Sequence, residues 1–257
     1  MKMNNMTIPH FEREFRVHVY ETFVDEKANI CALFNYMQDI AAEHAIRLGY
    51  GRDDLMKENN FWVLSRMYAE ISEYPFRDER ITVKTWPFGT DNVFALRFFD
   101  LKFPDGRTIA KASSSWLIID AETKRIRRPD QTLEQLSSYR KSHEMPVRIA
   151  EKIRETPAGG KVSDRFRVKV SDLDVNMHTN NVNYLKWTID SYDFDFMLKH
   201  FPVSVEINYL AESVLGDNIT IRTSGEGEST CAFTHSIMKD EAKELCRIRI
   251  EWKERKN

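Results

Sequence analysis

Polar side chains occupy every second position in one short segment, at Asp174, Asn176 and His178. In an extended chain, alternate side chains point to the same face, so these three groups are expected to project together. The apolar residues that alternate with them, Leu173, Val175 and Met177, would then point the other way and anchor the segment to a core. A helix is predicted to begin directly afterwards, which would turn its unpaired N–H groups and positive dipole end toward the same region. These are the parts of a site that stabilises a developing oxyanion.

The same pattern has a plainer interpretation, in which Asp174 and Asn176 are turn and capping residues and His178 lies on the surface. Internal repetition helps to choose between the two interpretations. The segment Phe15-Arg16-Val17-His18-Val19 returns as Phe166-Arg167-Val168-Lys169-Val170, at an offset of 151 residues. Further along, Ile81-Thr82-Val83-Lys84-Thr85 returns as Ile219-Thr220-Ile221-Arg222-Thr223, at an offset of 138. Two ordered matches favour duplication of one unit.

The polar set belongs to the second copy alone. At the 151 offset, the first copy has Phe23, Asp25 and Lys27 where the second has its Asp, Asn and His. The 138 offset places Glu212 against Tyr74, so a further carboxylate is also confined to the second copy. A polar set in one of two similar halves indicates a site rather than a requirement of the scaffold, although Glu212 alone could be a solvated acid at a strand end.

Each copy is predicted to contain an extended start, a helix of three to four turns and several strands. In the first copy Asn29 is the expected N-cap, and in the second copy Asn180 or Asn181. The apolar helix positions at helical spacing are Leu33, Met37, Ile40, Ala41 and His44 in the first copy, and Val182, Tyr184, Leu185, Trp187, Ile189 and Tyr192 in the second.

The strands are predicted from runs rich in Thr, Val and Phe, such as 94–99, followed by a hairpin turn at 104–107 and a last strand of the first sheet that includes 116–119. The charged, proline-containing stretch between the copies is expected to be a connector, with a helix over 132–139. We therefore predict an N-terminal repeat over 1–119, a connector over 120–164 and a C-terminal repeat over 165–257. The fold class is α+β, and an antiparallel sheet wrapped around one helix, twice over, is a double hotdog.

The pattern Asp174-x-Asn176-x-His178-x-Asn180-Asn181-x-x-Tyr184, with Glu212 downstream, resembles the acyl-ACP thioesterases of plants and bacteria. The first half resembles that family too, and the resemblance covers roughly residues 11–252. The matching segments of the first half are Tyr20-Glu21, Asp25, Ala28-Asn29-Ile30, Phe61-Trp62-Val63, Tyr74-Pro75, Thr85-Trp86, Ala112-Ser113-Ser114-Ser115-Trp116 and Thr123-Lys124-Arg125.

The resemblance implies a double hotdog that hydrolyses the thioester between a fatty acyl chain and acyl carrier protein. It implies that Asp174, Asn176, His178 and Glu212 form the catalytic set. The chain departs from some members of the family, which have Cys directly after the glutamate, where this sequence has Ser213. Because serine is a poor nucleophile at its free pKa, we expect attack by water rather than by a side chain.

In that scheme Glu212, helped by His178, would activate the water, and Asn176 with the helix-start N–H groups would bind the thioester oxygen. Asp174 would orient its neighbours or hold the base. The resemblance also implies that the first repeat holds the acyl chain between its helix and sheet, where Leu33, Phe34 and Met37 are candidate lining residues or simply core. Chain length is not predicted.

Acyl carrier proteins are acidic, and the densest basic run, Lys124-Arg125-Ile126-Arg127-Arg128, is a candidate docking patch or merely a solvated face. Overall charge does not predict binding to a nucleic acid, since 38 Lys and Arg face 40 Asp and Glu for a net charge of −2. Composition, with 42% apolar and 30% charged residues over 257 positions, excludes disordered and low-complexity classes.

Three cysteines without a C-x-x-C pair indicate reduced thiols, with Cys231 and Cys246 expected in strand cores. We expect no signal peptide, no membrane span and a cytoplasmic location. The histidines outside the polar set show no ligand spacing, so no metal and no organic cofactor are predicted. By analogy with related folds we expect a homodimer, with a monomer left open because the duplication already supplies a pair.

Three alternatives stay open. An acyl-CoA thioesterase of the hotdog fold would use similar chemistry on another carrier. A non-catalytic sensor of acyl thioesters would keep the fold and bind without hydrolysis, although all four polar residues are present. A hotdog hydratase is disfavoured because Met177 stands where its D-x-N-P-x-H segment has proline.

Overall fold

The computed structural model describes residues 10–129, 145–155, 160–225 and 231–255. The chain forms two compact units, one of Met1–Leu64 with Ser72–Arg148 and the other of Ser65–Ile71 with Ile149–Asn257. The helix predicted over 132–139 lies outside the described residues.

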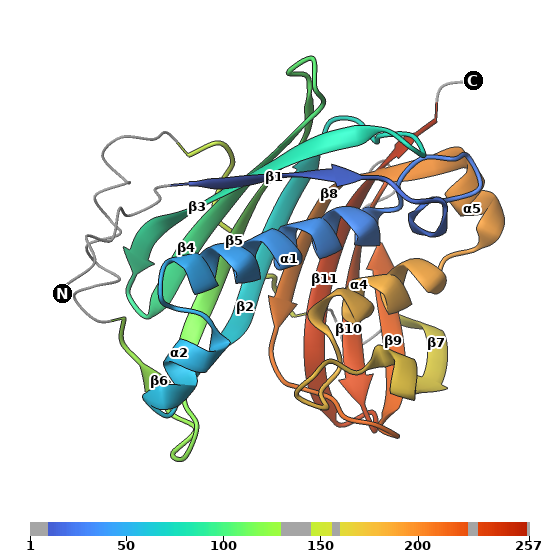
Figure 1. Ribbon diagram of the computed structural model, residues 1–257. Coiled ribbons are helices and arrows are strands. Elements are labelled where there is room, and N and C mark those ends of the chain that lie inside the picture. Colours follow the sequence, from blue (N-terminus) through green and yellow to red (C-terminus); the bar gives the residue numbers. More distant parts are fainter. Residues whose placement is uncertain (1–9, 130–144, 156–159, 226–230, 256–257) are drawn as a thin grey trace. The chain divides into compact units, whose positions relative to one another are not determined.

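The first unit places a long helix against an antiparallel sheet. Its elements are β1 (Phe11–Arg16), the 3-10 turn η1 (Val19–Glu21), α1 (Ile30–Arg47), α2 (Arg52–Lys57), the start of β2 (Asn60–Ile71), β3 (Arg80–Asp91), β4 (Phe94–Lys102), β5 (Thr108–Asp120) and β6 (Ile126–Arg127). The strands pair in the order β1-β3-β4-β5, and β6 adds to β5. Figure 1 shows α1 running along this sheet, and it contacts β1 and β3.

The second unit repeats this arrangement. Its elements are β7 (Lys161–Arg167), the 3-10 turn η3 (Val170–Asp172), α4 (Asn181–Asp190), α5 (Phe194–Lys199), β8 (His200–Tyr209), β9 (Asn218–Gly225), β10 (Ala232–Lys239) and β11 (Lys243–Glu254). The strands pair in the order β7-β9-β10-β11-β8, and the Arg66–Glu70 part of β2 pairs with β8. The α4 helix contacts β11 (Figure 1).

The two repeated sequence segments are neighbours in both sheets. Phe15 of β1 pairs with Ile81 of β3, and Phe166 of β7 pairs with Ile219 of β9. Both sequence matches therefore mark the same pair of adjacent strands in the same register. The predicted duplication and the α+β class are confirmed.

The helices begin where the sequence predicts, and α1 is longer than the predicted three to four turns. Asn29 caps α1 by accepting the N–H of Ala32 at 2.9 Å, and Asn180 caps α4 by accepting the N–H of Val182 at 2.9 Å. The α1 helix has 18 residues, about five turns, because its chain has no stop signal before Gly49, which takes a φ of 78°. The α4 helix has 10 residues, within the predicted length.

The apolar helix positions form the core of each unit. The five predicted α1 positions are all buried, as are Val182, Tyr184, Leu185 and Trp187 of α4. Trp187 packs edge-on against Phe166 with ring centroids 5.0 Å apart. Ile189 and Tyr192, which were expected on the same stripe, are half-buried at the end of the helix and beyond.

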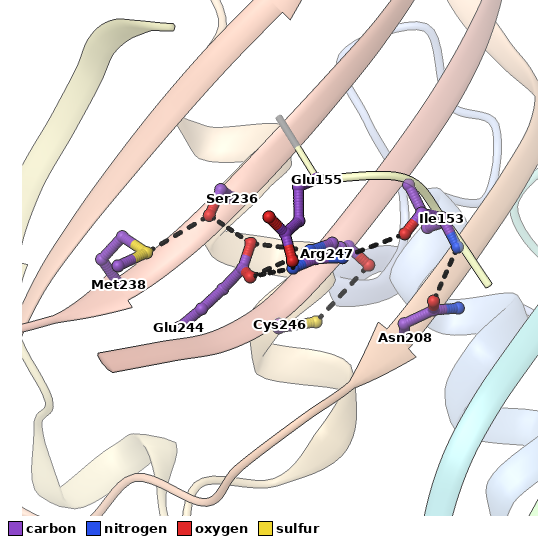
Figure 2. Close-up of polar contacts among 8 residues, drawn as sticks. All are labelled: Ile153, Glu155, Asn208, Ser236, Met238, Glu244, Cys246 and Arg247. Atoms are coloured by element: carbon purple, nitrogen blue, oxygen red, sulfur yellow. Dashed lines mark hydrogen bonds and ion pairs between the residues drawn. The ribbon is translucent and has the colours of Figure 1, made fainter. Parts of the chain in front are cut away.

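Polar side chains fasten residues 149–155 to the second sheet (Figure 2). Asn208 of β8 accepts the N–H of Ile153 at 2.8 Å, and Arg247 of β11 donates to the Ile153 carbonyl at 3.1 Å. Arg247 also pairs with Glu244 through three hydrogen bonds and lies 3.3 Å from Glu155. Part of the stretch that the sequence presents as a connector is thus held on this sheet by a buried arginine.

Candidate active site

The segment that carries the polar set is a tight loop rather than an extended strand. The N–H of Asp174 donates to the His178 carbonyl at 2.8 Å, and the N–H of Met177 donates to the Asp174 carbonyl at 3.0 Å. Met177 takes a φ of 62°, in the left-handed region. Leu173 and Thr179 form an isolated bridge that closes the loop.

The predicted apolar anchor is therefore wrong for two of its three residues, whereas Leu173 is half-buried. Val175 is 84% exposed and Met177 is 72% exposed, so neither reaches a core. The reason is that a turn with one left-handed residue breaks the two-residue alternation of a strand, on which the prediction depended. The backbone of the three polar residues folds back on itself, so they do not share one strand face.

Asp174 holds this turn with its side chain. Its Oδ1 accepts the N–H of Asn176 at 2.8 Å and the N–H of His178 at 3.2 Å. The Asn176 amide nitrogen lies 3.5 Å from Asp174 Oδ2, at the long limit of a hydrogen bond. The turn role of the plainer interpretation is thus real for Asp174, whose side chain draws the backbone N–H groups of Asn176 and His178 to one carboxylate oxygen.

Glu212 lies beside His178 although 33 residues separate them in the chain. The backbones of His178 and Val214 form an isolated bridge, and the N–H of Thr179 donates to the Ser213 carbonyl at 2.9 Å. The Nδ1 atom of His178 is 3.5 Å from Oε2 of Glu212, and the two side chains are 39% and 53% exposed. Water therefore reaches both groups, and the 3.5 Å distance is longer than an ordinary hydrogen bond between two such side chains.

The first unit contains the same loop without the polar set. The N–H of Phe23 donates to the Lys27 carbonyl at 2.8 Å, and Glu26 takes a φ of 62°, like Met177. Lys27 forms an isolated bridge with Phe76, as His178 does with Val214. The backbone of the loop is a property of the repeat, whereas the side chains that could do chemistry are specific to the second unit.

Ser213 does not occupy the position of a nucleophile. The residue is 1% exposed, and its hydroxyl lies 2.7 Å from Thr179 Oγ1 and 3.0 Å from the Tyr184 hydroxyl. Burial raises the pKa of Tyr184 to about 12, so its phenol keeps its proton at neutral pH. The buried contacts of Ser213 agree with the expectation of attack by water.

The start of α4 offers fewer free N–H groups than the sequence suggests. Asn180 accepts the N–H of Val182 with its side chain and the N–H of Asn183 with its carbonyl, both at 2.9 Å. The N–H of Asn180 itself donates to the Asp172 carbonyl at 2.9 Å. Over residues 160–225, no acceptor lies within hydrogen-bond distance of the N–H of Asn181.

The two cysteines of the second unit differ in burial. Cys246 is fully buried in β11, as expected, whereas Cys231 is half-buried just before β10 and is not a strand-core residue. The described parts of the chain contain no group of three His, Cys, Asp or Glu residues that could hold a metal ion. The three candidate acyl-lining residues of α1 are fully buried, and the basic run 124–128 is exposed around the short strand β6.

Sequence reasoning missed the hydroxyl cluster of Thr179, Tyr184 and Ser213. The sequence pattern places Tyr184 on the apolar helix stripe, and it distinguishes Ser213 only by the cysteine that some family members have there. The 151 and 138 offsets carry the signal that could have found the cluster, because they set these three residues against Ala28, Leu33 and Pro75, which lack a side-chain hydroxyl.

Comparison with known proteins identifies the family. Residues 9–136 match the profile of the acyl-ACP thioesterase N-terminal domain, and residues 156–254 match that of the C-terminal domain. The chain belongs to the acyl-ACP thioesterase family. The resemblance inferred from its motifs is thereby confirmed.

Curated relatives agree with this family assignment. The chain is 26% identical over 266 residues to the chloroplastic palmitoyl-acyl carrier protein thioesterase of Arabidopsis thaliana, covering 94% of this chain and 63% of that protein. It is 25% identical over 268 residues to an acyl-[acyl-carrier-protein] hydrolase of Cuphea viscosissima, covering 95% of this chain and 62% of that protein. The chain thus spans somewhat less than two thirds of the length of these relatives.

Solved structures show the same fold. An acyl-ACP thioesterase from Bacteroides thetaiotaomicron superposes with a TM-score of 0.87 at 24% identity, covering 98% of this chain and all of that one. The 12:0-ACP thioesterase from Umbellularia californica superposes with a TM-score of 0.83 at 20% identity, covering 98% and 97%. The double-hotdog prediction is confirmed. Of the helices in the described residues, none has the length and apolar character needed to cross a membrane.

Proposed function

We propose that the protein hydrolyses the thioester of fatty acyl-acyl carrier protein and releases a free fatty acid and the carrier thiol. The observation that carries the proposal is the contact between Glu212 and His178, which are 3.5 Å apart and exposed to water in the second unit of a chain from this family. A carboxylate beside an imidazole, open to solvent, suits activation of a water molecule.

The proposed mechanism assigns one task to each polar residue. Glu212, assisted by His178, removes a proton from water, and the oxygen attacks the thioester carbonyl carbon. Asn176 and the free N–H of Asn181 support the oxyanion that forms. When the carbon–sulfur bond breaks, the proton taken from water passes to the leaving sulfur, so the products are a carboxylic acid and a thiol. Asp174 holds the turn that presents Asn176 and His178.

The acyl chain and the carrier protein also need binding sites on the chain. We propose that the acyl chain is bound in the first repeat, predicted at 1–119, and that catalysis belongs to the second, predicted at 165–257. The predicted connector 120–164 is not a separate linker, because β6 pairs with β5, residues 149–155 are held on the second sheet and β7 begins at Lys161. The exposed run at 124–128 is the proposed landing patch for the acidic carrier. We further propose a homodimer, to be tested by analytical ultracentrifugation, and a cytoplasmic location, which is supported by a sequence of three cysteines without a C-x-x-C pair.

The test is thiol release from matched acyl-ACP and acyl-CoA substrates with chains from C8 to C18. Glu212→Gln and His178→Ala are each expected to lower kcat by roughly 100-fold or more without loss of fold, as judged by circular dichroism. Lys27→Ala is the matched control, since Lys27 holds the position of His178 in the loop of the first unit.

The result separates the alternatives. Preference for the ACP substrates, with loss of turnover in the two variants, supports the proposal and shows the chain-length preference. Preference for CoA substrates would indicate the acyl-CoA thioesterase. Tight acyl binding without thiol release would indicate the non-catalytic sensor and contradict the proposed hydrolysis.

A further inference from the structure

The hydroxyl of Tyr184 contacts both peptide groups that flank Glu212. It accepts the N–H of Ser213 at 3.1 Å and lies 3.5 Å from the carbonyl of Ala211. The first contact involves the peptide bond after Glu212, and the second involves the peptide bond before it. A side chain from α4 thus holds the backbone of Glu212 from both sides.

Two more hydroxyls extend this contact to the His178 side of the site. Thr179 Oγ1 lies 2.7 Å from Ser213 Oγ, which lies 3.0 Å from the Tyr184 hydroxyl. If Thr179 donates to Ser213, Ser213 to Tyr184 and Tyr184 to the Ala211 carbonyl, every proton of the cluster has an acceptor. Both Thr179 and Ser213 are buried, so the cluster is closed to competing water.

The carboxylate of Glu212 has little else to hold it. Within the described ranges, the ion-pair contact of this carboxylate is with His178 Nδ1, at 3.5 Å. The Glu212 side chain is 53% exposed. The orientation of a half-exposed glutamate depends on where its backbone starts, since its three side-chain torsions are otherwise free. Contacts that fix the Glu212 backbone therefore also help to fix the distance between Glu212 and His178.

The first unit shows that the fold does not need these hydroxyls. Ala28, Leu33 and Pro75 stand in the three equivalent positions, and all three are buried. The N–H of Ala28 still donates to the Pro75 carbonyl at 2.8 Å, the counterpart of the 2.9 Å bond from Thr179 to Ser213. The same backbone contact forms with apolar side chains, so the hydroxyls accompany the polar set and not the scaffold.

We propose that Thr179, Tyr184 and Ser213 are positioning residues that hold Glu212 against His178 in the reactive arrangement. The inference rests on the proposed function and goes further, because it assigns the buried serine next to Glu212 a role in geometry. The cluster acts through Glu212 and does not contact substrate.

The first experiment is Tyr184→Phe, assayed on acyl-ACP. It removes the shared hydroxyl and retains the ring, so kcat is expected to fall roughly 10- to 100-fold while KM changes less than about threefold. Tyr192→Phe is the matched control in the same unit, because the Tyr192 hydroxyl is also buried against partners, at 2.8 Å from His235 and 3.0 Å from Trp252. The control is expected to lower the melting temperature and leave kcat unchanged.

A second experiment asks whether Tyr184 acts through Glu212. In a Glu212→Gln background, adding Tyr184→Phe is expected to cause no further loss of kcat, since the group being positioned is already gone. Thr179→Val, which keeps the shape and loses the hydroxyl, is expected to lower kcat about 10-fold, and Thr179→Ser is expected to restore it.

The outcomes that would overturn the inference are distinct from failure of the proposed function. Full kcat in Tyr184→Phe and Thr179→Val, or an independent loss from Tyr184→Phe in the Glu212→Gln background, would remove the positioning role. If Tyr184→Phe fails to fold, Thr179→Val and Thr179→Ser still decide the question. Absence of hydrolysis by the wild-type protein on every acyl-ACP tested would instead remove the proposed function.

Discussion

At the scale of single residues, Asp174 uses one carboxylate oxygen to hold the backbone of the loop that carries the candidate site. Its Oδ1 accepts from the N–H groups of Asn176 and His178, at 2.8 and 3.2 Å. An asparagine could make both bonds with its side-chain oxygen, whereas an alanine could make neither. The carboxylate's charge and its turn-forming role can therefore be separated by substitution.

Asp174→Ala is expected to lower kcat on acyl-ACP by about 10-fold or more, because His178 loses one support of its position. Asp174→Asn is expected to keep most of the activity, and steady-state kinetics of both variants is the measurement. Asp25→Ala is the control, since Asp25 accepts the N–H of Lys27 at 3.2 Å in the equivalent loop of the first unit. An equal loss in the Asn and Ala variants would show that charge, and not the turn, is what Asp174 supplies.

At the scale of elements, buried polar groups tie the strands of the second unit to their neighbours. His235 of β10 is fully buried, with its ring nitrogens 2.8 Å from the Tyr192 hydroxyl and 2.9 Å from the Thr223 hydroxyl. Burial lowers the pKa of His235 to about 3 from its ordinary value of 6.5. The folded protein therefore keeps this histidine neutral where the unfolded chain protonates it.

The sign of the pH effect follows from this difference. Between the two pKa values the unfolded state binds more protons, so stability falls as the pH drops below 6.5 toward 3. We expect His235 alone to cost roughly 2–3 kcal/mol of unfolding free energy between pH 7 and pH 4.5. Urea unfolding at a series of pH values measures this loss of unfolding free energy. In the His235→Gln variant the unfolding free energy should fall less steeply as the pH drops below 6.5. An unchanged acid limb in that variant would assign the loss to other groups.

The Arg247 cluster is the second such tie (Figure 2). Burial alone would raise the pKa of Glu244, but hydrogen bonds from Arg247 and Ser236 outweigh it and lower that pKa. Arg247 thus neutralises the mostly buried carboxylate of Glu244. It also donates a hydrogen bond to the Ile153 carbonyl.

Arg247→Met is expected to lower the unfolding free energy by roughly 3 kcal/mol, because it leaves Glu244 buried without its partner. Adding Glu244→Gln should recover part of that loss. Glu155→Gln is the control on the same arginine, and it should change stability by less than about 0.5 kcal/mol since Glu155 is 83% exposed. Denaturant unfolding measures all three variants, and a neutral Arg247→Met would show that the cluster adds nothing to stability.

At the scale of the whole molecule, duplication has left two similar units with different surfaces. The polar set lies in the second unit, and the exposed basic run around β6 lies in the first. Of that run, Arg127 lies 3.7 Å from Asp120, a weak surface pair that leaves it open to a partner.

Replacing Arg125, Arg127 and Arg128 by Gln is expected to lower kcat/KM for acyl-ACP about 10-fold at low salt and to flatten its salt dependence, because steering of an acidic carrier is screened by ions. Turnover of acyl-CoA should change little. The control is Gln at Arg16, Arg77 and Arg80, three exposed arginines of the same unit. If both triple variants change kcat/KM for acyl-ACP equally, the carrier does not dock specifically on the run 124–128, and the effect reflects another surface or the net charge.

The sequence by itself determined the features that depend on neighbours along the chain. Asn29 and Asn180 cap their helices, the α1 stripe is buried, and the two offsets mark one strand pair in both sheets. These features follow from local periodicity and capping, which a single segment carries. The motif from Asp174 to Tyr184, with Glu212 and the matching segments of the first half, indicated the family that the comparisons confirm.

Only the tertiary structure decided how the polar residues meet. The alternation of Asp174, Asn176 and His178 suggested a strand, but a left-handed Met177 and the bonds of Asp174 make a turn. The hydroxyls of Thr179 and Ser213 are 34 residues apart in the chain, and Arg247 is 94 residues from the carbonyl it holds. Such contacts depend on which strands and loops pack together, and no periodicity within a segment records that.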